Sequence, residues 1–176
     1  MGLIFLTGMP GTGKTTVGAM LARELHWRFI DLDADIERRV GKTIPQIFAE
    51  EGETAFREYE SSALDEACRL TEAVVALGAG ALERDQNLDL VASSGMLVYL
   101  RTDMNTLVER CASAFSRPLL VGAETKEDLM TRLQSLLERR EQRFLAAPII
   151  VDGTPGQSAQ ETAEKVLWAL SSHAAG

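Results

Sequence analysis

The sequence predicts an α/β fold with three layers, α/β/α, in which a five-stranded parallel sheet lies between two layers of helices. Short apolar runs rich in β-branched or aromatic residues alternate with longer segments of helical period. This alternation is typical of a parallel sheet that helices cover on both faces. A glycine-rich loop also stands between the first apolar run and the first helical segment, where parallel α/β folds place an anion-binding turn.

Five apolar runs are the candidate strands. Each is short, apolar and rich in β-branched or aromatic side chains, as expected for strands buried on both faces. In chain order they cover residues 3–7, 28–32, 73–77, 96–100 and 149–151.

Seven segments of helical period separate or follow these runs. They cover residues 14–25, 33–40, 44–51, 54–71, 104–112, 126–144 and 159–170. The last segment has a clear pattern, because Ala163, Val166, Leu167 and Leu170 repeat at i, i+3, i+4 and i+7. We expect this helix to close the fold by packing on the sheet. Residues 113–125 form the least periodic internal stretch, and we expect a lid over about residues 112–125.

Composition indicates one ordinary globular domain. The chain has 176 residues, of which 45% are apolar and 25% are charged. A chain of this length buries about 70% of the surface that its unfolded form exposes, so its core needs neither disulfides nor a structural metal. We find no internal repeat and no long linker, and we therefore expect a single domain over residues 1–176.

The charge balance excludes several classes of partner. Eighteen Lys and Arg residues face 26 Asp and Glu residues, giving a net charge of −8, which argues against a general affinity for nucleic acid or anionic lipid. No apolar run approaches the length of a membrane span and no basic leader precedes residue 3, so we expect a cytoplasmic protein.

Cys68 and Cys111 lack zinc-ligand spacing and are interpreted as small packing residues.

Residues 8–15, Gly-Met-Pro-Gly-Thr-Gly-Lys-Thr, match the phosphate-loop pattern G-x-x-x-x-G-K-[ST] in its required place between a strand and a helix. The glycines let successive backbone N–H groups face a phosphate, and the helix that follows adds its positive end. Lys14 would neutralise the β- and γ-phosphate oxygens, and the Thr15 hydroxyl would bind Mg²⁺. The candidate nucleotide contacts here are Gly11, Thr12, Gly13, Lys14, Thr15 and Thr16.

Two acids follow the second candidate strand. Strand alternation would point the side chains of Asp31 and Asp33 to the same side. One could hold the metal through water while the other faces a substrate. The alternative is that Asp33 only caps the helix that begins near Ala34.

The chain resembles shikimate kinases, a family of P-loop kinases similar to nucleoside-monophosphate kinases. The resemblance covers nearly the whole chain and is carried by several segments together: the phosphate loop, Asp31-Leu32-Asp33, residues 44–48 with Gly52-Glu53 and Phe56-Arg57, residues 77–81, and Arg117-Pro118-Leu119-Leu120. It implies a P-loop kinase architecture with a five-stranded parallel sheet, a substrate-binding segment over residues 33–60 and a lid. It also implies transfer of a phosphoryl group from ATP, with Mg²⁺, to the 3-hydroxyl of shikimate in aromatic amino-acid biosynthesis by a monomer.

The resemblance assigns roles on the acceptor side. Asp33 would contact the shikimate hydroxyls and act as a base toward the attacking one. Arg57 would be one of two arginines that bind the substrate carboxylate, a role that suits the planar fork of a guanidinium. The glycine-rich turn Gly78, Ala79 and Gly80 would complete the substrate site.

On the nucleotide side, the resemblance makes Asp31 the residue that holds Mg²⁺ through water. Arg117 would be the lid arginine that reaches the transferred phosphate, consistent with catalysis by charge stabilisation. Arg110 would flank the adenine, although it could instead stabilise the C-terminal end of its helix. The loop over residues 153–156, which includes Pro155, would bracket the adenine as well.

The second carboxylate-binding arginine should lie late in the long helix, where Arg139, Arg140 and Arg143 compete. At 100° per residue, Arg140 lies near the centre of the apolar stripe and Arg139 about 100° away, so we select Arg140. The stripe consists of Leu129, Leu133, Leu136, Leu137 and Phe144. An arginine in that position needs an anionic partner, which is either a ligand or a buried acid.

The sequence departs from the family at two positions. Ala79 stands where the family has the middle one of three glycines, and it would be strained if its φ were positive but would only narrow the pocket if φ were negative. Phe144 replaces the usual tyrosine. Two alternatives to a shikimate kinase therefore stay open: a kinase for another small hydroxy acid such as gluconate, and a nucleotide-binding protein without catalysis.

Overall fold

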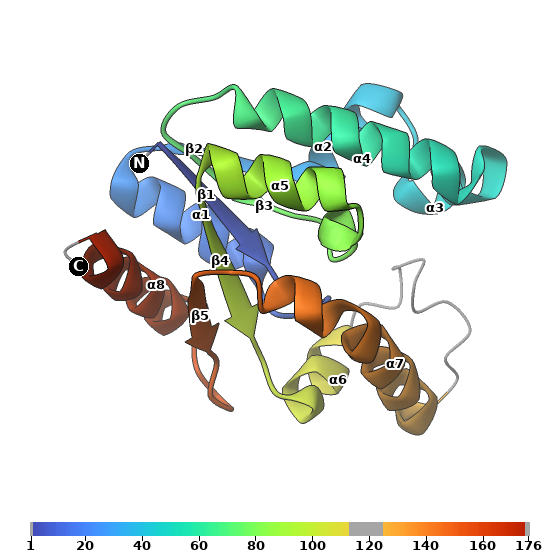
Figure 1. Cartoon of the computed structure of the whole chain (residues 1–176). Helices are drawn as coiled ribbons and strands as arrows, with labels where there is room; N and C mark the ends of the chain where they lie inside the picture. Colours follow the sequence, from blue (N-terminus) through green and yellow to red (C-terminus); the bar gives the residue numbers. More distant parts are fainter. Residues whose placement is uncertain (1, 113–124, 175–176) are drawn as a thin grey trace.

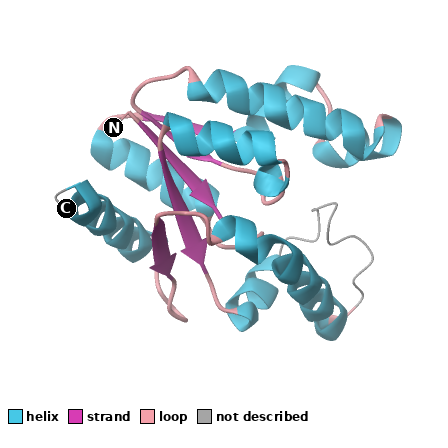
Figure 2. Ribbon diagram, viewed as in Figure 1, coloured by secondary structure: helices cyan, strands magenta, loops and turns pink. Residues whose placement is uncertain are grey.

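A computed structural model describes residues 2–112 and 125–174, and it confirms a five-stranded parallel sheet flanked by helices (Figures 1 and 2). The strand order is β2-β3-β1-β4-β5, and every neighbouring pair is parallel. The strands are β1 Leu3–Thr7, β2 Arg28–Asp31, β3 Ala73–Ala76, β4 Met96–Arg101 and β5 Ile149–Asp152.

The predicted helices form within a few residues of the expected bounds. They are α1 Lys14–Leu25, α2 Leu32–Val40, α3 Ile44–Glu50, α4 Gly52–Cys68, α6 Met104–Ala112, α7 Lys126–Phe144 and α8 Ala159–Ala174. Two further elements, the 3₁₀ turn η1 (Ala81–Glu83) and helix α5 (Asp85–Ser94), lie in a segment where we predicted no structure. Helix α5 escapes a search for apolar period because one of its buried positions is Asn87, whose Nδ2 donates to the carbonyl of Ala81 at 2.8 Å.

The two faces of the sheet bury separate hydrophobic cores. Ile4 and Leu6 of β1 point to a core shared with α1 and α8, and Leu3 and Phe5 point to a core shared with α2 to α7. This division follows from strand alternation, and burial on both faces explains why β1 is apolar throughout. The closing helix α8 lies on the sheet as predicted.

Residues 113–124, most of the expected lid, lie outside the described residues, and so does Arg117. The chain is described again from Thr125, which begins α7 with a capping box: its hydroxyl accepts from the N–H of Asp128, and Asp128 accepts from the N–H of Thr125. Within the described ranges, no helix is long and apolar enough to cross a membrane.

Gly18 lets α1 approach the sheet closely. A Cβ atom built at Gly18 would lie 2.5 Å from Cε2 of Phe29 and 3.3 Å from Cδ1 of Leu6. Helix propensity alone would make Gly18→Ala stabilising by about 1 kcal/mol. We predict instead a loss of about 1–2 kcal/mol in the free energy of unfolding, measured with urea, because the added methyl group overlaps the Phe29 ring.

Ala19→Gly, on the exposed face of the same helix, is the matched control. It should cost about 1 kcal/mol through propensity alone. A Gly18→Ala protein that is more stable than the unchanged protein would show that the packing of α1 on Phe29 does not require glycine.

Candidate active site

A cavity of about 470 Å³ lies beyond the carboxyl ends of β1, β2 and β3. This is the edge at which open α/β sheets bind ligands. Its walls come from the phosphate loop, from α2 to α4 and from the turn after β3. Most of the predicted site residues line it, namely Gly11, Gly13, Lys14, Thr15, Thr16, Asp31, Asp33, Arg57, Gly78, Ala79 and Gly80.

The phosphate loop wraps tightly at the start of α1. Gly11 and Gly13 have φ of 85° and 90°, a left-handed conformation that favours glycine. The buried Thr12 faces the interior of the loop, where its hydroxyl donates to the carbonyl of Met9 at 3.0 Å. Lys14 Nζ donates to the carbonyls of Gly8 and Met9 at 2.8 and 3.0 Å, so its charge lies over the loop. Backbone N–H groups, the helix N-terminus and Lys14 together make a site for phosphate.

Asp31 and Asp33 both line the cavity, as predicted, but strand alternation is not the reason. Strand β2 ends at Asp31, and Asp33 lies in the first turn of α2, so alternation along one strand does not align them. Asp31, and not Asp33, caps α2: its Oδ1 accepts from the N–H of Ala34 at 3.2 Å. Helix α2 thus begins two residues earlier than a cap at Asp33 would require.

The phosphate loop and β2 present oxygen atoms suited to Mg²⁺. The hydroxyl of Thr15 donates to Oδ2 of Asp31 at 2.5 Å, which places a hydroxyl and a carboxylate side by side. Mg²⁺ prefers such oxygens and commonly takes only one or two carboxylates, with water and substrate phosphates completing its shell. In the described part of the chain, no group of three or more His, Cys, Asp or Glu residues could hold a metal ion. A metal ion at this site would therefore need water and phosphate oxygens as further ligands. Thr15 and Asp31 therefore fit the ion of a nucleotide complex.

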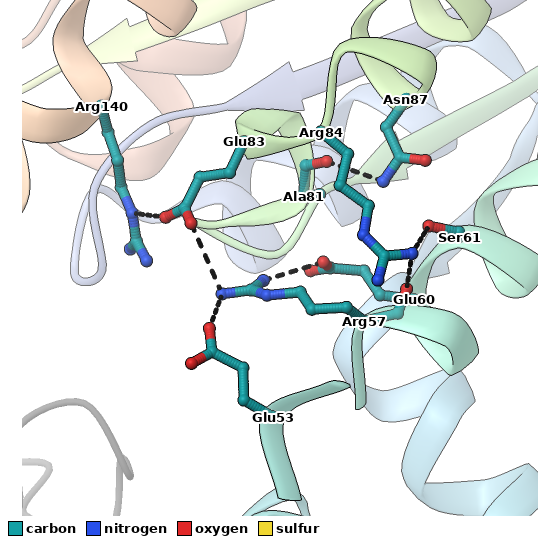
Figure 3. A network of polar contacts seen from close by, with 9 residues as sticks. All are labelled: Glu53, Arg57, Glu60, Ser61, Ala81, Glu83, Arg84, Asn87 and Arg140. Atoms are coloured by element: carbon teal, nitrogen blue, oxygen red, sulfur yellow. Dashed lines mark hydrogen bonds and ion pairs between the residues drawn. The ribbon is translucent and has the colours of Figure 1, made fainter. Parts of the chain in front are cut away.

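Arg57 is held by two glutamates of its own helix, α4. Its Nη1 donates to Glu60 at 2.9 Å and its Nη2 to Glu53 at 3.1 Å (Figure 3). A Cβ atom at Gly80 would lie 2.5 Å from Nη1 of Arg57, so glycine is needed for this close approach. Arg57 is buried yet lines the cavity.

Glu60 is the buried counter-charge of Arg57. Its side chain is 1% exposed, and its Oε1 has no hydrogen-bond partner. Burial raises the pKa of the Glu60 carboxyl, although Arg57 opposes the shift. Burial also disfavours the charge on Arg57, but Glu60, Glu83 and Glu53 outweigh it and raise the pKa of the guanidinium.

Arg140 is the buried arginine of α7, as its place in the apolar stripe predicted. Its side chain is 3% exposed, while Arg139 is exposed and its Nε donates to the carbonyl of Ser135. Arg140 Nε donates to Oε1 of Glu83 at 2.5 Å. Burial lowers the pKa of Arg140, and Glu83 opposes the shift. The anionic partner of Arg140 in the structure is thus an acid of the chain, Glu83, whose side chain is 41% exposed.

Ala79 is not strained by its side chain. Among the described residues, only His26 and Glu72 have positive φ without being glycine. Ala79 therefore has an ordinary backbone conformation, and its methyl group lines the cavity. The sequence left open whether Ala79 is strained or only narrows the pocket. The structure supports the second possibility, because the methyl group takes up space that a glycine would leave free.

The candidate adenine residues lie beside the phosphate loop and outside the main cavity. Arg110 Nη1 donates to the carbonyl of Gly11 at 3.3 Å. Arg110 and Gly153 line the same small hollow, and Pro155 lines a neighbouring one. The fold thus brings α6 and the loop after β5 to one side of the phosphate loop.

Three acids at the site were not singled out for it from the sequence. Glu53 and Glu60 stand four residues before and three after Arg57, which is the spacing of ion pairs on one helix and a signal that could have revealed them. Glu83 pairs with Arg140, 57 positions away, and no local signal marks such a contact.

Comparison with known proteins gives a consistent result. The family model described as shikimate kinase matches residues 10–171. The shikimate kinase of Chlorobium chlorochromatii is 42% identical over 171 residues, which cover 93% of this chain and 90% of the relative.

Solved structures agree. A shikimate kinase from Acinetobacter baumannii in complex with shikimate superposes with a TM-score of 0.91 at 35% identity, covering 98% of this chain and 94% of that one. The shikimate kinase from Bacteroides thetaiotaomicron gives a TM-score of 0.90 at 33% identity, covering 97% and 98%.

The burial of Glu60 predicts a pH dependence of stability. Because its pKa is higher in the folded than in the unfolded protein, the folded state takes up the proton first as the pH falls. As the pH falls from neutrality toward the ordinary glutamate value of about 4.3, the free energy of unfolding should rise relative to that of Glu60→Gln, which cannot titrate. Urea unfolding at a series of pH values measures the difference.

Glu58→Gln, at an exposed position on the same helix, controls for replacing a carboxylate by an amide. A constant difference between the unchanged protein and Glu60→Gln across this range would contradict the raised pKa.

Proposed function

We propose that this chain, which belongs to the shikimate kinase family, transfers the γ-phosphoryl group of ATP to the 3-hydroxyl of shikimate, forming shikimate 3-phosphate and ADP. The observation that carries the proposal is a single cavity in which a phosphate loop faces a carboxylate and a buried arginine. This reaction is one step of aromatic amino-acid biosynthesis.

Catalysis here rests on positioning and on charge. The loop N–H groups and Lys14 bind the β- and γ-phosphates, and Lys14 exchanges its contacts with the carbonyls of Gly8 and Met9 for phosphate oxygens. Thr15 and Asp31 hold Mg²⁺, which neutralises charge on the phosphates when bound. Gly11, Thr12, Gly13 and Thr16 complete the phosphate side.

The acceptor side orients the hydroxyl that attacks. Asp33 accepts its proton as the oxygen bonds to the γ-phosphorus and the bond to the β-γ bridging oxygen breaks. Arg57 and Arg140 bind the substrate carboxylate, and Gly78, Ala79 and Gly80 form the wall between this clamp and Asp33. A Cβ atom at Gly78 would lie 2.7 Å from Oδ1 of Asp33, which shows how closely that wall meets the base.

The remaining assignments follow the family pattern. Arg117, in the proposed lid, reaches the transferred phosphate, and Arg110 and Pro155 flank the adenine. The enzyme acts as a cytoplasmic monomer on a small molecule. Its net charge of −8 supports the view that nucleic acids and anionic membranes are not its partners.

The direct test is ADP release from Mg-ATP with shikimate, with gluconate and without acceptor, using Lys14→Ala as the blank. We expect turnover that depends on shikimate. Turnover with gluconate but not with shikimate would show that the substrate is another hydroxy acid. Nucleotide binding without ADP release for any acceptor would indicate a non-catalytic protein.

The helix α7 offers a matched pair of variants for the carboxylate clamp. Arg140→Lys should raise KM for shikimate by about 10- to 100-fold with a smaller effect on kcat, because an ammonium lacks the fork that matches a carboxylate. Arg139→Lys, exposed on the same helix, should leave both constants unchanged. Steady-state kinetics at saturating ATP measure both, and equal effects of the two variants would exclude Arg140 from the clamp.

A further inference from the structure

Glu83 lies between the two arginines that are proposed to bind the substrate carboxylate (Figure 3). Its Oε1 accepts from Arg140 Nε at 2.5 Å, and its Oε2 lies 3.8 Å from Arg57 Nη2. Each carboxylate oxygen of Glu83 thus faces one arginine. A substrate carboxylate held by the same two arginines would present its oxygens in the same way.

The two arginines depend on Glu83 to different degrees. Arg57 also pairs with Glu60 and Glu53, whereas Glu83 supplies the one ion pair that Arg140 makes within the described residues. Arg140 Nη1 is buried without a hydrogen-bond partner, and Arg140 does not line the main cavity. Arg140 is thus paired with Glu83 and lies outside the lining of the cavity.

Glu83 is more exposed than the two arginines that it contacts. Its side chain is 41% exposed, while those of Arg57 and Arg140 are 10% and 3% exposed. It stands on the 3₁₀ turn η1, and the next residue, Arg84, donates to the carbonyl of Arg57 and to the hydroxyl of Ser61 in α4. These bonds hold the backbone of the turn on α4, so a change of side-chain rotamer is the movement by which Glu83 would leave.

We propose that Glu83 is a specificity-determining residue that occupies the carboxylate clamp in the free enzyme and competes with the substrate carboxylate for Arg57 and Arg140. This inference rests on the proposed function. The incoming carboxylate replaces that of Glu83, so the number of negative charges around the two arginines does not change.

Charge favours displacement over simultaneous binding. If Glu83 remained, the substrate carboxylate would be a fourth negative charge, beside Glu53, Glu60 and Glu83, around two guanidinium groups, and like charges at short distance repel. If Glu83 leaves, the number of negative charges around Arg57 and Arg140 stays at three. A ligand without a negative charge cannot make this exchange, so Glu83 selects for acids.

The test compares Glu83→Gln with Asp85→Asn. Asp85 is a matched control because it also pairs with an arginine of α7, Arg143, but on the surface. Glu83→Gln should lower KM for shikimate by about three- to tenfold, since a charge-assisted contact no longer has to be broken. Its kcat and its KM for ATP should stay unchanged, and Asp85→Asn should change none of the three.

A thermal-shift measurement adds a second readout. Glu83→Gln should lower Tm of the free protein, because Arg140 loses its counter-charge, and should increase the rise in Tm on adding shikimate. A higher KM would overturn the proposal by showing that Glu83 orients Arg140 for the substrate. An unchanged KM would overturn it by showing that Glu83 does not compete.

A structure of the unchanged protein with shikimate tests the proposal without any variant. We expect the Glu83 carboxylate beyond hydrogen-bond distance of both arginines, and retention of its bond to Arg140 Nε would overturn the proposal. Failure of the proposed function is distinguishable, because the unchanged enzyme would then show no ADP release with shikimate, whatever Glu83 does.

Discussion

The geometry of the site depends on the burial of two guanidinium groups in a small protein. Arg57 and Arg140 are almost fully removed from solvent, and a buried charge is tolerated only with a counter-charge close by. Glu60 and Glu83 meet that requirement, and Gly80 provides the space in which Arg57 lies. The same few contacts therefore stabilise both buried guanidinium groups and decide which groups face them.

The sheet brings the acid at the end of β2 and the glycine turn after β3 to the phosphate loop. The loop follows β1, Asp31 ends β2 and the turn with Gly78 follows β3, and these three strands are neighbours in a parallel sheet. Their carboxyl ends open on one edge, so donor and acceptor chemistry meet there even though the residues come from distant segments. The two separate cores on the faces of the sheet keep this edge fixed.

The departures from the family pattern leave this arrangement intact. Ala79 has an ordinary backbone conformation and adds one methyl group to the cavity wall. Phe144 is buried and its ring lies against that of Tyr99, with ring centroids 5.1 Å apart, so this side chain is part of the core. Neither change removes a charged group from the site.

The sequence alone determined the order and type of the elements, because an apolar run or a helical period records burial directly. It located the phosphate loop through the spacing of Gly8, Gly13 and Lys14, and it singled out Arg140 because a helix turns 100° per residue. It missed helix α5, where a buried amide takes the place of an apolar side chain, and the cap that it offered for α2 as an alternative role of Asp33 belongs to Asp31. Only the tertiary structure decided the backbone conformation at Ala79 and the contact of Glu83 with Arg140, since φ angles and contacts between distant segments arise from packing and leave no local pattern.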